Sequence, residues 1–594
     1  MNTQILSGYD NYILFGTDNV AIEVLHKLSA AGFDVYAFCD KNKEKWGTSI
    51  EGIPVITPDE LAEYVKKEKT LTIICETGSK HLPAALFDEL CVPYVFYTKP
   101  IFVEITSFCN QSCNFCTYGI TKREKMNMDP EIMKAFLQDL GSENSDVLYP
   151  TIFPHVLGEP LVSKHFFDFM DICKELNFYV CLVTNWALMN KEIQDKLFSE
   201  YPDFDIIFSM QGATKRVFDR RGEKHLTYED WINLLFEILE CKFKYAHKGL
   251  MRICILSPEV VNNVLTRSDV PLDLFEWYES IDEFKEWKRE FGKRCDDFRD
   301  EMQKKYPENF ETIKDAKSPI PYKYTAYTPL TDLEQWSETD TMEQFNFAPN
   351  CLIYAKNFGT WGADDLLKTL LPDDKYVYNE ENWHAMTEKC DRLGDVSLLS
   401  SGQLVACNID GEADYILADL TKGEKYSDEK TQDRLHKLRD NLSLSPMCRR
   451  CKSRALVFDK TDIDGDRQEI VHYGIRWHRK RENSSGEVYR TSYELSNAFV
   501  FPRLHASKLE IDIESVQSKK QFTLIKILSY NEEKDLFTER KNFSIQLKPG
   551  ERKRLSIPYT FQKGTLHRVD FITATERTQG VDDGVAVYSA GLAV

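Results

Sequence analysis

The sequence has little of what an exported, membrane-embedded or nucleic-acid-binding protein requires. No apolar run approaches the roughly 20 residues of a membrane-spanning helix. The first residues lack the basic start, apolar stretch and small-residue cleavage site of a signal peptide. The chain also lacks an excess of positive charge: its net charge is −20, whereas a nucleic-acid surface needs clustered lysine and arginine. We therefore expect a cytoplasmic protein with no membrane span and no nucleic-acid partner.

Cysteine, by contrast, is plentiful, with sixteen in 594 residues. A reducing compartment keeps cysteines as thiols, so clustered ones indicate metal or iron–sulfur ligands and scattered ones indicate small buried side chains. Nine are scattered, mostly inside apolar strand-like runs, as Cys39 and Cys75 are, and we expect these in the core. The other seven form the two candidate ligand sets: Cys109, Cys113, Cys116, Cys390, Cys407, Cys448 and Cys451.

Strand-like and helix-like segments alternate over the first half of the chain. Tyr12–Phe15 and Val35–Cys39 resemble parallel strands around a helical run, which predicts a small parallel sheet. From Ile101 to about Leu256 the alternation resumes, as in a full or partial parallel (β/α) barrel with functional loops at the strand carboxyl ends. After a polar linker at Arg479–Gly486, short alternating segments predict antiparallel strands. The predicted fold class is α/β with an all-β C-terminal domain.

The string Cys109-x3-Cys113-x2-Cys116 directly follows an apolar strand. Three thiolates within eight residues suit three corners of a cubane iron–sulfur cluster and leave one iron open for a ligand. A zinc site that lacks its fourth ligand is the alternative. The spacing resembles the signature of the radical S-adenosylmethionine superfamily.

The resemblance to this superfamily continues beyond the cysteines. Phe115, before the third cysteine, matches the aromatic residue that the family places against the adenine. Gly158-Glu159-Pro160, after the second strand, is similar to the family's GGE/GEP motif, which receives the methionine amino group. Arg123 stands where relatives carry a basic residue.

The third and fourth strands end in further family-like motifs. Thr184-Asn185 resembles the TN-G motif, with Trp186 in place of the usual glycine. Ser209, which the resemblance assigns to the ribose, opens a segment similar to S-x-D-G-A-T, but Gln211 replaces the acid. The motifs recur at successive strand ends in the family's order.

The resemblance implies the cofactors and the chemistry. A [4Fe-4S] cluster would bind S-adenosylmethionine through its open iron, and one-electron cleavage would give methionine and a 5′-deoxyadenosyl radical that abstracts hydrogen from the substrate. The cofactor carries this chemistry, while the protein positions the substrate. The implied electron donor is a flavodoxin or a ferredoxin-type protein.

The second cysteine set resembles the twitch domain, the shortened relative of the SPASM domain. Its members are Cys390, Cys407 and the pair Cys448 and Cys451, with Gly402 at the expected place before Cys407. Four cysteines fill one cubane or bind one tetrahedral zinc ion, and spacing alone leaves both open. With the first motif upstream, we expect one auxiliary [4Fe-4S] cluster. No cysteine follows for a second.

Full ligation of the auxiliary cluster would suit an electron relay that takes the electron left when a substrate radical is oxidised. Asp410 and Asn408, just beyond Cys407, are the candidate catalytic bases.

The flanking segments bear on the substrate. The N-terminal segment resembles the Rossmann-like modules of sugar-modifying and acyltransferase proteins, but its Gly-rich fingerprint keeps only Gly16. A docking domain with a vestigial pocket is therefore the alternative to a nucleotide site. The C-terminal segment, with a turn at Pro549-Gly550, resembles β-sandwiches of surface-polysaccharide enzymes.

We therefore expect a small-molecule or glycan substrate: a sugar, a nucleotide sugar or a polyol that is oxidised or epimerised. The alternatives are a ribosomal peptide or protein substrate, and a non-catalytic iron–sulfur protein. The expected domains are a Rossmann-like domain (1–98), the radical domain (99–270), a helical insertion with barrel completion (271–380), the twitch-like domain (381–478) and a β-sandwich-like domain (487–594).

Overall fold

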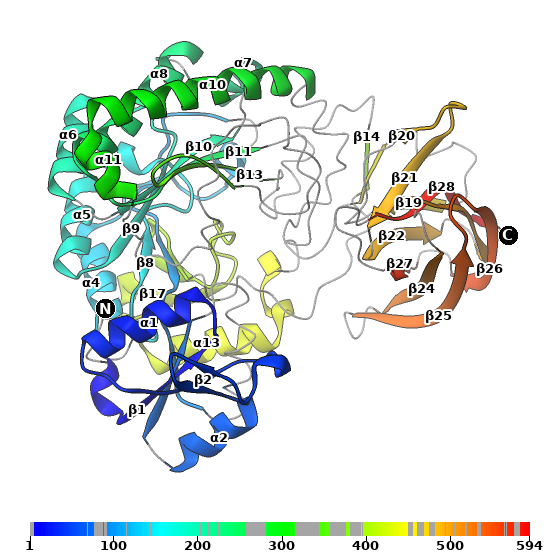
Figure 1. Cartoon of the computed structure of the whole chain (residues 1–594), viewed down its shortest axis with the longest axis horizontal. Helices are drawn as coiled ribbons and strands as arrows, with labels where there is room; N and C mark the ends of the chain where they lie inside the picture. Colours follow the sequence, from blue (N-terminus) through cyan, green and yellow to red (C-terminus); the bar gives the residue numbers. More distant parts are fainter. Residues whose placement is uncertain are drawn as a thin grey trace.

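The computed structural model shows an α/β body and, to one side of it, a body of long strands near the C-terminus (Figure 1). The structure describes residues 5–67, 69–75, 87, 92–113, 116–142, 145–201, 204–211, 214–223, 225–256, 281–314, 344–356, 376–379, 394, 396–448, 456–459, 469–473, 481–493, 495–502, 505–516, 520–531, 536–562, 565, 567–574 and 583–593. Within these ranges no helix combines the length and apolar character needed to cross a membrane. The predicted fold class is confirmed.

The N-terminal sheet has six strands in the order β3-β4-β2-β1-β5-β6. Its elements are β1 (Asn11–Phe15), α1 (Asn19–Ala30), β2 (Val35–Cys39), β3 (Ser49–Ile50), β4 (Ile53–Ile56), α2 (Pro58–Lys67), β5 (Thr70–Ile74) and β6 (Tyr94–Phe96). All pairings are parallel except that of β3 with β4. Successive side chains of a strand point to opposite faces of the sheet. Leu14 of β1 therefore packs in one core with Val24 of α1, and Ile13 packs in the other core with Leu61 of α2.

The N-terminal sheet continues directly into the main sheet. The strand β7 (Pro100–Val103) begins only three residues after β6. The amides of Leu148 and Tyr149 donate to the carbonyls of Phe96 and Tyr97 at 2.9 and 2.8 Å, so hydrogen bonds bridge the gap between the two sheets. The two sheets are therefore joined by backbone pairing as well as by the chain itself.

The main sheet has ten strands in the order β12-β13-β11-β10-β9-β8-β7-β15-β16-β17. Its first part contains β7, α4 (Pro130–Leu140), β8 (Thr151–Phe153), α5 (Phe166–Glu175), β9 (Tyr179–Thr184), α6 (Lys191–Glu200), β10 (Phe204–Gln211), α7 (Lys215–Phe218), α8 (Tyr228–Lys244), β11 (Met251–Leu256), β12 (Gln344–Ala348) and β13 (Cys351–Lys356). From β7 through β11 to β13 the neighbours pair in parallel. Among the described residues the sheet ends at β12 and β17, so the predicted barrel is an open, partial one.

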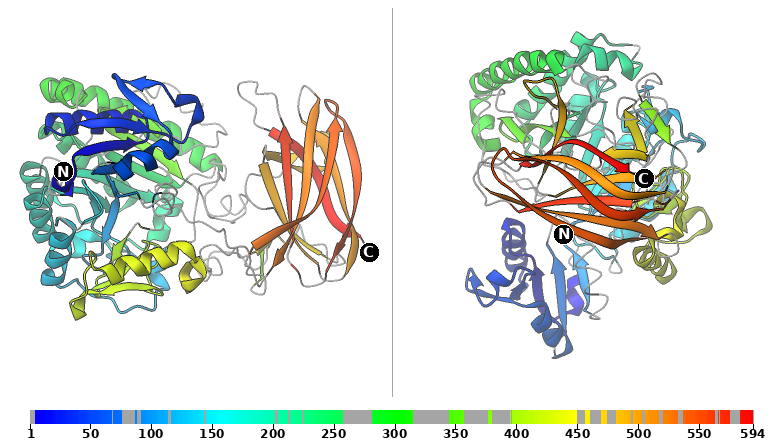
Figure 2. Two further views of the ribbon diagram at one scale, coloured as in Figure 1. Left: turned by 90° about the horizontal axis from the view of Figure 1, so that it is seen from below. Right: turned by 90° about the vertical axis from the view of Figure 1, so that its right-hand side faces the viewer.

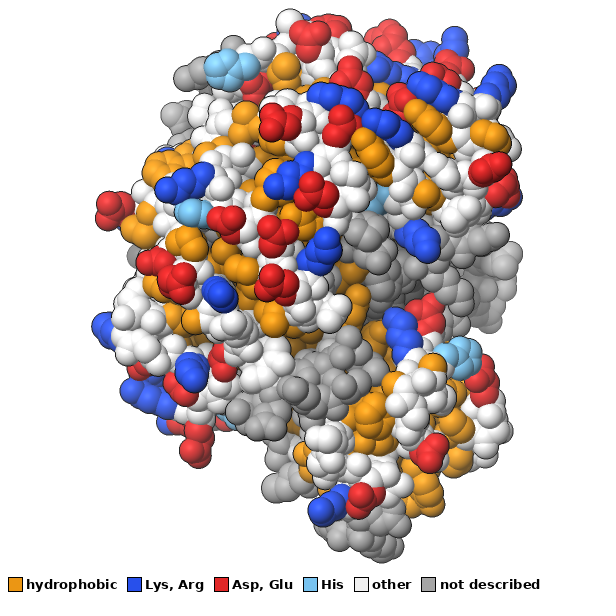
Figure 3. Space-filling view, turned by 90° about the vertical axis from the view of Figure 1, so that its left-hand side faces the viewer, with side chains coloured by type: hydrophobic (Ala, Val, Ile, Leu, Met, Phe, Trp, Pro, Cys, Tyr) orange, Lys and Arg blue, Asp and Glu red, His pale blue; other side chains and the backbone are white. Residues whose placement is uncertain are grey.

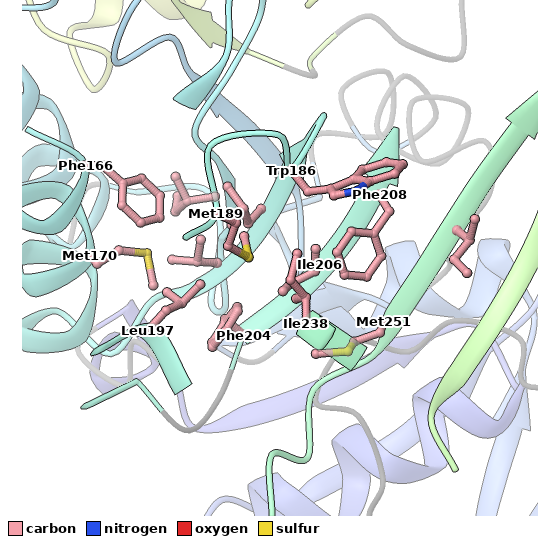
Figure 4. Packing of buried hydrophobic residues seen from close by; sticks show 14 of the residues in the cluster. Phe166, Met170, Trp186, Met189, Leu197, Phe204, Ile206, Phe208, Ile238 and Met251 are labelled. Atoms are coloured by element: carbon pink, nitrogen blue, oxygen red, sulfur yellow. The ribbon is translucent and has the colours of Figure 1, made fainter. Parts of the chain in front are cut away.

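Helices cover the outer face of the main sheet. Phe166 and Met170 of α5 and Leu197 of α6 belong to one apolar cluster with the strand residues Ile206 and Met251 (Figure 4). On the solvent side of this layer, acidic and basic side chains are interspersed (Figure 3). The helices are therefore amphipathic, as the 3.6-residue spacing predicted.

The charge-rich segment after β11 forms two helices where it is described, α10 (Ile281–Lys305) and α11 (Pro307–Lys314). The rings of Phe291 and Phe298 in α10 lie 5.6 and 5.3 Å from that of Phe236 in α8. The ring of Phe310 in α11 lies 5.5 Å from Phe243. The segment is thus docked through an apolar face and is not a fully solvated helix.

A hairpin from the second cysteine region extends the main sheet. It consists of β15 (Ser397–Leu398) and β16 (Gln403–Val405), followed by β17 (Ile416–Asp419). Ser397 and Leu398 pair in parallel with Phe102 and Val103 of β7. The hairpin turns at Gly402 and lies beside β7, the strand that leads to Cys109.

The helix α13 (Glu429–Asp440) follows β17. Just before this helix, Tyr426 makes a buried polar contact with residues next to β7 and β8. Lys99 Nζ donates to Asp146 at 3.0 Å and to Tyr426 Oη at 2.9 Å, and Tyr426 Oη donates to Asp146 at 2.7 Å. Lys99 holds the pKa of the Asp146 carboxyl below its usual range despite burial. The contact joins segments that are about 280 residues apart.

The C-terminal body consists of two antiparallel sheets of five strands packed face to face (Figure 2). The strands are β19 (Glu469–Tyr473), β20 (Arg481–Glu482), β21 (Val488–Tyr493), β22 (Leu495–Pro502), β23 (Ala506–Ser515), β24 (Gln521–Asn531), β25 (Leu536–Leu547), β26 (Arg552–Phe561), β27 (His567–Ala574) and β28 (Asp583–Ala593). A separate two-stranded sheet pairs β14 (Tyr376–Asn379) with β18 (Leu456–Asp459). Alternate residues such as Ile511, Ile525 and Val569 form the sandwich core.

His567 should make the sandwich sensitive to acid. Its ring is buried among Tyr559 and Phe561, and burial lowers its pKa from 6.5 to about 4. Because the unfolded chain binds the proton first as pH falls, this residue's contribution to stability is lost from about pH 6.5 down to about pH 4, by on the order of 3 kcal/mol. Thermal unfolding followed by circular dichroism at about pH 7 and about pH 5 checks this. A His567→Leu variant with an equally steep loss would contradict it.

Candidate radical-enzyme site

The cysteine loop follows β7 at the carboxyl end of the main sheet. Cys109, Cys113 and Cys116 are all partly buried. Two amides point at sulfur atoms: Gln111 N lies 3.5 Å from Cys109 Sγ, and Tyr118 N lies 3.4 Å from Cys116 Sγ. N–H···S bonds of this kind stabilise the thiolates of iron–sulfur sites. Phe115, the expected adenine contact, lies outside the described residues.

The chemistry of these donors fits an iron–sulfur cluster. Burial raises the pKa of the Cys109 thiol to about 12 and that of Cys116 to about 11, so the sulfurs stay protonated without a cation. A cationic iron core reverses this preference, because the thiolate is the form that binds metal. Among the described side chains, no three His, Cys, Asp or Glu gather around one ion position.

The second motif lies directly against the cysteine loop. Glu159 N donates to Phe108 O at 2.8 Å, one residue before Cys109. Gly158 has φ +81°, and a Cβ there would lie 2.6 Å from Thr106 O and 2.7 Å from Phe108 O. Glycine is therefore required at position 158 both by the left-handed backbone and by the close approach of the two loops.

The Glu159 carboxylate joins the second motif to the third. It accepts hydrogen bonds from Thr184 Oγ1 at 2.6 Å and from Asn185 N at 2.8 Å. Burial raises the pKa of Glu159 to about 7, while the two donors act in the opposite direction. Pro160 opens the next short turn and is buried. The side chain of Glu159 is thus used within the protein, where it joins the second motif to the third.

The third motif in turn contacts the cysteine loop. Asn185 Nδ2 donates to Asn110 Oδ1 at 2.9 Å and lies 4.0 Å from Cys109 Sγ. Trp186, in the usual glycine position, has φ +51°, which explains why relatives favour glycine there. Its ring is fully buried and stacks on Trp231 at 4.2 Å, and this packing offsets the backbone strain.

The fourth motif lies at the end of β10. Gln211 Nε2 donates to Ser209 Oγ at 2.7 Å, and both side chains are partly exposed. Gln211 also has a left-handed backbone, with φ +60°. The amide that replaces the family's acid therefore orients the hydroxyl expected to contact ribose.

A buried ion pair that the sequence analysis missed connects these loops. Glu104, at the end of β7 and fully buried, forms two bonds of 2.6 Å with Arg123. It also accepts from Leu157 N at 2.9 Å and from Ser400 N and Oγ at 2.9 and 2.8 Å. The sequence signal was a lone carboxylate in an apolar strand, which needs a cationic partner once buried.

The Cys407 loop lies against the first cysteine loop. Glu412 accepts from the Thr121 hydroxyl and from Lys122 N, the latter at 3.2 Å. Cys407 is partly buried and receives an N–H from Ile409 at 3.5 Å. The two cysteine regions, far apart in sequence, therefore meet in the fold.

The candidate bases occupy the same loop. Asp410 is buried and accepts from the amides of Asp414 and Tyr415 at 2.8 and 3.0 Å, the pattern of a loop-stabilising aspartate. Asn408 Oδ1 lies 3.7 Å from Cys407 Sγ. Cys448 is partly buried and packs on the same apolar core as Tyr415. The remaining predicted ligands, Cys390 and Cys451, lie outside the described residues.

Two acidic side chains near the carboxyl ends of the N-terminal strands make hydrogen bonds within the protein. Asp18 caps α1 by accepting from the amides of Val20 and Ala21 at 3.1 and 3.2 Å, at the helix end where a phosphate group can bind in nucleotide-binding folds. Asp40, directly after β2, accepts from Thr17 and from Lys45 Nζ, the latter at 3.0 Å.

One family model matches the part of the chain that contains the four motifs from Cys109 to Gln211. Residues 103–264, from β7 through β11, match the model of the radical SAM superfamily. The chain contains a radical SAM domain. This finding bears out the resemblance inferred from the sequence, and the additional cysteines beyond the matched residues fit a C-terminal cluster domain.

Solved structures similar to the chain include two proteins whose structures have been solved with S-adenosylmethionine (AdoMet) bound. BtrN in complex with AdoMet and 2-DOIA is 13% identical, with 60% of this chain and 92% of BtrN covered and a TM-score of 0.28. Streptococcus suis SuiB bound to its precursor peptide SuiA is 13% identical, with 74% and 85% covered and a TM-score of 0.33. UDP-D-quinovosamine 4-dehydrogenase from Vibrio fischeri matches 15% of this chain and 77% of its own at 18% identity, with a TM-score of 0.14. Scores this low carry no argument about function.

Gly158→Ala should disrupt the first cysteine loop of the radical SAM domain. The added methyl group would overlap two backbone carbonyls that have no room to move, so we expect most of the iron at this site to be lost. Gly119→Ala is the matched control in the same loop, because nothing lies within 4 Å of its Cβ position. Iron and sulfide are measured after anaerobic reconstitution. Equal iron in both variants would contradict the required close approach.

Proposed function

We propose that this chain is an enzyme that reductively cleaves S-adenosylmethionine at a [4Fe-4S] cluster held by Cys109, Cys113 and Cys116. The observation that carries the proposal is the hydrogen-bonded convergence of the motif loops on the cysteine loop, through Glu159 and Asn185. When bound, the cluster supplies the electron that cleaves the sulfonium to methionine and a 5′-deoxyadenosyl radical, which takes hydrogen from the substrate.

The surrounding residues bind and orient the cosubstrate in this proposal. The turn Gly158-Glu159-Pro160 receives the methionine amino group, and its backbone is held for this role by the Glu159 side chain. Ser209, oriented by Gln211, contacts the ribose. Thr184 and Asn185 hold the turn and the cysteine loop together, while Phe115 is the assigned adenine contact.

We assign Cys390, Cys407, Cys448 and Cys451 to one auxiliary [4Fe-4S] cluster that acts as an electron relay. The contact of Glu412 with Lys122 supports this assignment, because it holds the Cys407 loop next to the first cysteine loop. Short separation between redox centres and the substrate is what an electron relay needs. A flavodoxin or ferredoxin-type protein is the proposed donor to the first cluster.

Iron counting tests both cluster assignments. The reconstituted protein should hold about eight irons, and a Cys109/Cys113/Cys116→Ala variant about four. Buried Cys39→Ala is the control, since its thiol lies in the N-terminal core. About four irons that fall to none, with one zinc ion retained, would instead make the second site a structural zinc site.

Cosubstrate cleavage separates an enzyme from a non-catalytic iron–sulfur protein. Chemically reduced protein should convert S-adenosylmethionine to methionine and 5′-deoxyadenosine, measured by liquid chromatography and mass spectrometry. The triple cysteine variant should form none, because it lacks the ligands of the first cluster. A fully reconstituted protein that also forms none would overturn the proposed activity.

For the substrate we propose a sugar, a nucleotide sugar or a polyol, oxidised or epimerised at a carbon that loses hydrogen. The proposal rests on the flanking regions, an α/β sheet before the radical SAM domain and a β-sandwich after it. A ribosomal peptide or protein is the alternative, and mass spectrometry of both substrate classes after turnover separates the two.

Asp410 and Asn408 remain the proposed bases. Asp410→Asn removes the carboxylate and keeps an oxygen acceptor for one of the two loop amides, since Asp414 N and Tyr415 N bond to different carboxylate oxygens. If Asp410 is the base, the variant should keep its iron and its 5′-deoxyadenosine formation but lose product at least about tenfold. Loss of auxiliary iron in Asp410→Asn would instead show that the carboxylate serves the loop.

A further inference from the structure

Arg221 is a buried cation beside the first cysteine loop. It ends the short turn Asp219–Arg221 after α7 and is only 1% exposed. Its guanidinium donates to Gln111 Oε1 at 3.1 Å and to the carbonyls of Ser209 and Met210 at the end of β10. No motif identified in the sequence includes this residue.

Neighbouring residues hold Arg221 in one position. The guanidinium lies 4.8 Å from the centre of the Trp231 ring, the same ring that stacks on Trp186. From the other side, Ser112 N donates to the Arg221 carbonyl at 3.0 Å. Burying a guanidinium costs free energy, so a buried arginine at this place suggests a role at the site besides stability.

Gln111 connects Arg221 to the cysteine ligand and to an opposing charge. Its Oε1 accepts from Arg221 and lies 3.7 Å from Cys113 Sγ. Its Nε2 donates to Glu223 Oε2 at 2.9 Å. Arg221 lowers and Glu223 raises the pKa of Cys113, although burial has the largest effect and the net direction is upward. One cation and one anion thus act on the same sulfur in opposite senses.

We propose that Arg221 and Glu223 set the reduction potential of the cluster held by Cys109, Cys113 and Cys116, Arg221 raising it and Glu223 lowering it. The inference rests on the proposed function, because it needs that cluster. A reduced cluster carries one more negative charge, so a nearby cation stabilises the reduced state and an anion destabilises it. Burial weakens solvent screening, so both effects persist at ordinary ionic strength.

The test is a redox titration followed by electron paramagnetic resonance. It uses the full chain with Cys407→Ala and Cys448→Ala as the parent, so that only the first cluster gives a signal. Arg221→Gln should shift the potential to more negative values, and Glu223→Gln to more positive values. Arg221→Lys keeps the charge and should stay nearer the parent than Arg221→Gln. Opposite shifts would not follow from general structural damage.

Arg252→Gln is the matched control for the loss of a buried arginine. Arg252 is 7% exposed in β11 and contacts Asp205 and Cys181, away from the cysteine loop, so its removal should leave the potential unchanged. If Arg221→Gln fails to hold iron, Glu223→Gln decides alone, because Glu223 is only partly buried.

The outcomes separate the two proposals. A parent that binds no iron and gives no signal overturns the proposed function and this inference with it. If the parent binds the cluster but Arg221→Gln and Glu223→Gln have its reduction potential, the inference alone is overturned. The same holds if both variants shift the reduction potential in the same direction. S-adenosylmethionine added to the parent should alter its spectrum, which identifies the remaining cluster as the one with the open iron.

Discussion

One buried carboxylate, that of Glu104, holds the active end of the molecule together. It accepts two hydrogen bonds from the guanidinium of Arg123 and one from the amide of Leu157. It also accepts from the amide and the hydroxyl of Ser400, in the hairpin of the second cysteine region. A buried carboxylate is costly unless its hydrogen bonds and its ion pair are all formed. Glu104 therefore stabilises β7 and the three segments that bond to it together. The other contacts of the site, including those of Glu159 and Asn185, depend on the loop positions that these bonds define.

Much of the radical SAM domain could be predicted because its signals are local. Apolar strand runs preceded each motif, and parallel strands bring their carboxyl ends to one edge. Cys109, Glu159, Asn185 and Ser209 could therefore be assigned to one region before any coordinates were known. The alternation expected from Ile101 to about Leu256 corresponds to the segment from β7 to β11.

What the sequence could not provide depends on contacts between distant segments. Nothing in Ser397–Leu398 indicates that these residues pair with β7, because edge pairing depends on which strand is free in the folded sheet. Trp231 looked like any apolar residue of a helix, and only the fold shows that it supports both Trp186 and Arg221. The departure from the family pattern at Trp186 was visible in the sequence, but its left-handed backbone was not.

The backbone pairing between the N-terminal and main sheets also limits how the molecule can move. Bonds from Leu148 and Tyr149 to Phe96 of β6 and to Tyr97 lie at the point where a hinge between the two sheets would have to act. Any rotation of the N-terminal sheet relative to the main sheet would have to break these bonds, so the two sheets are coupled in their motion.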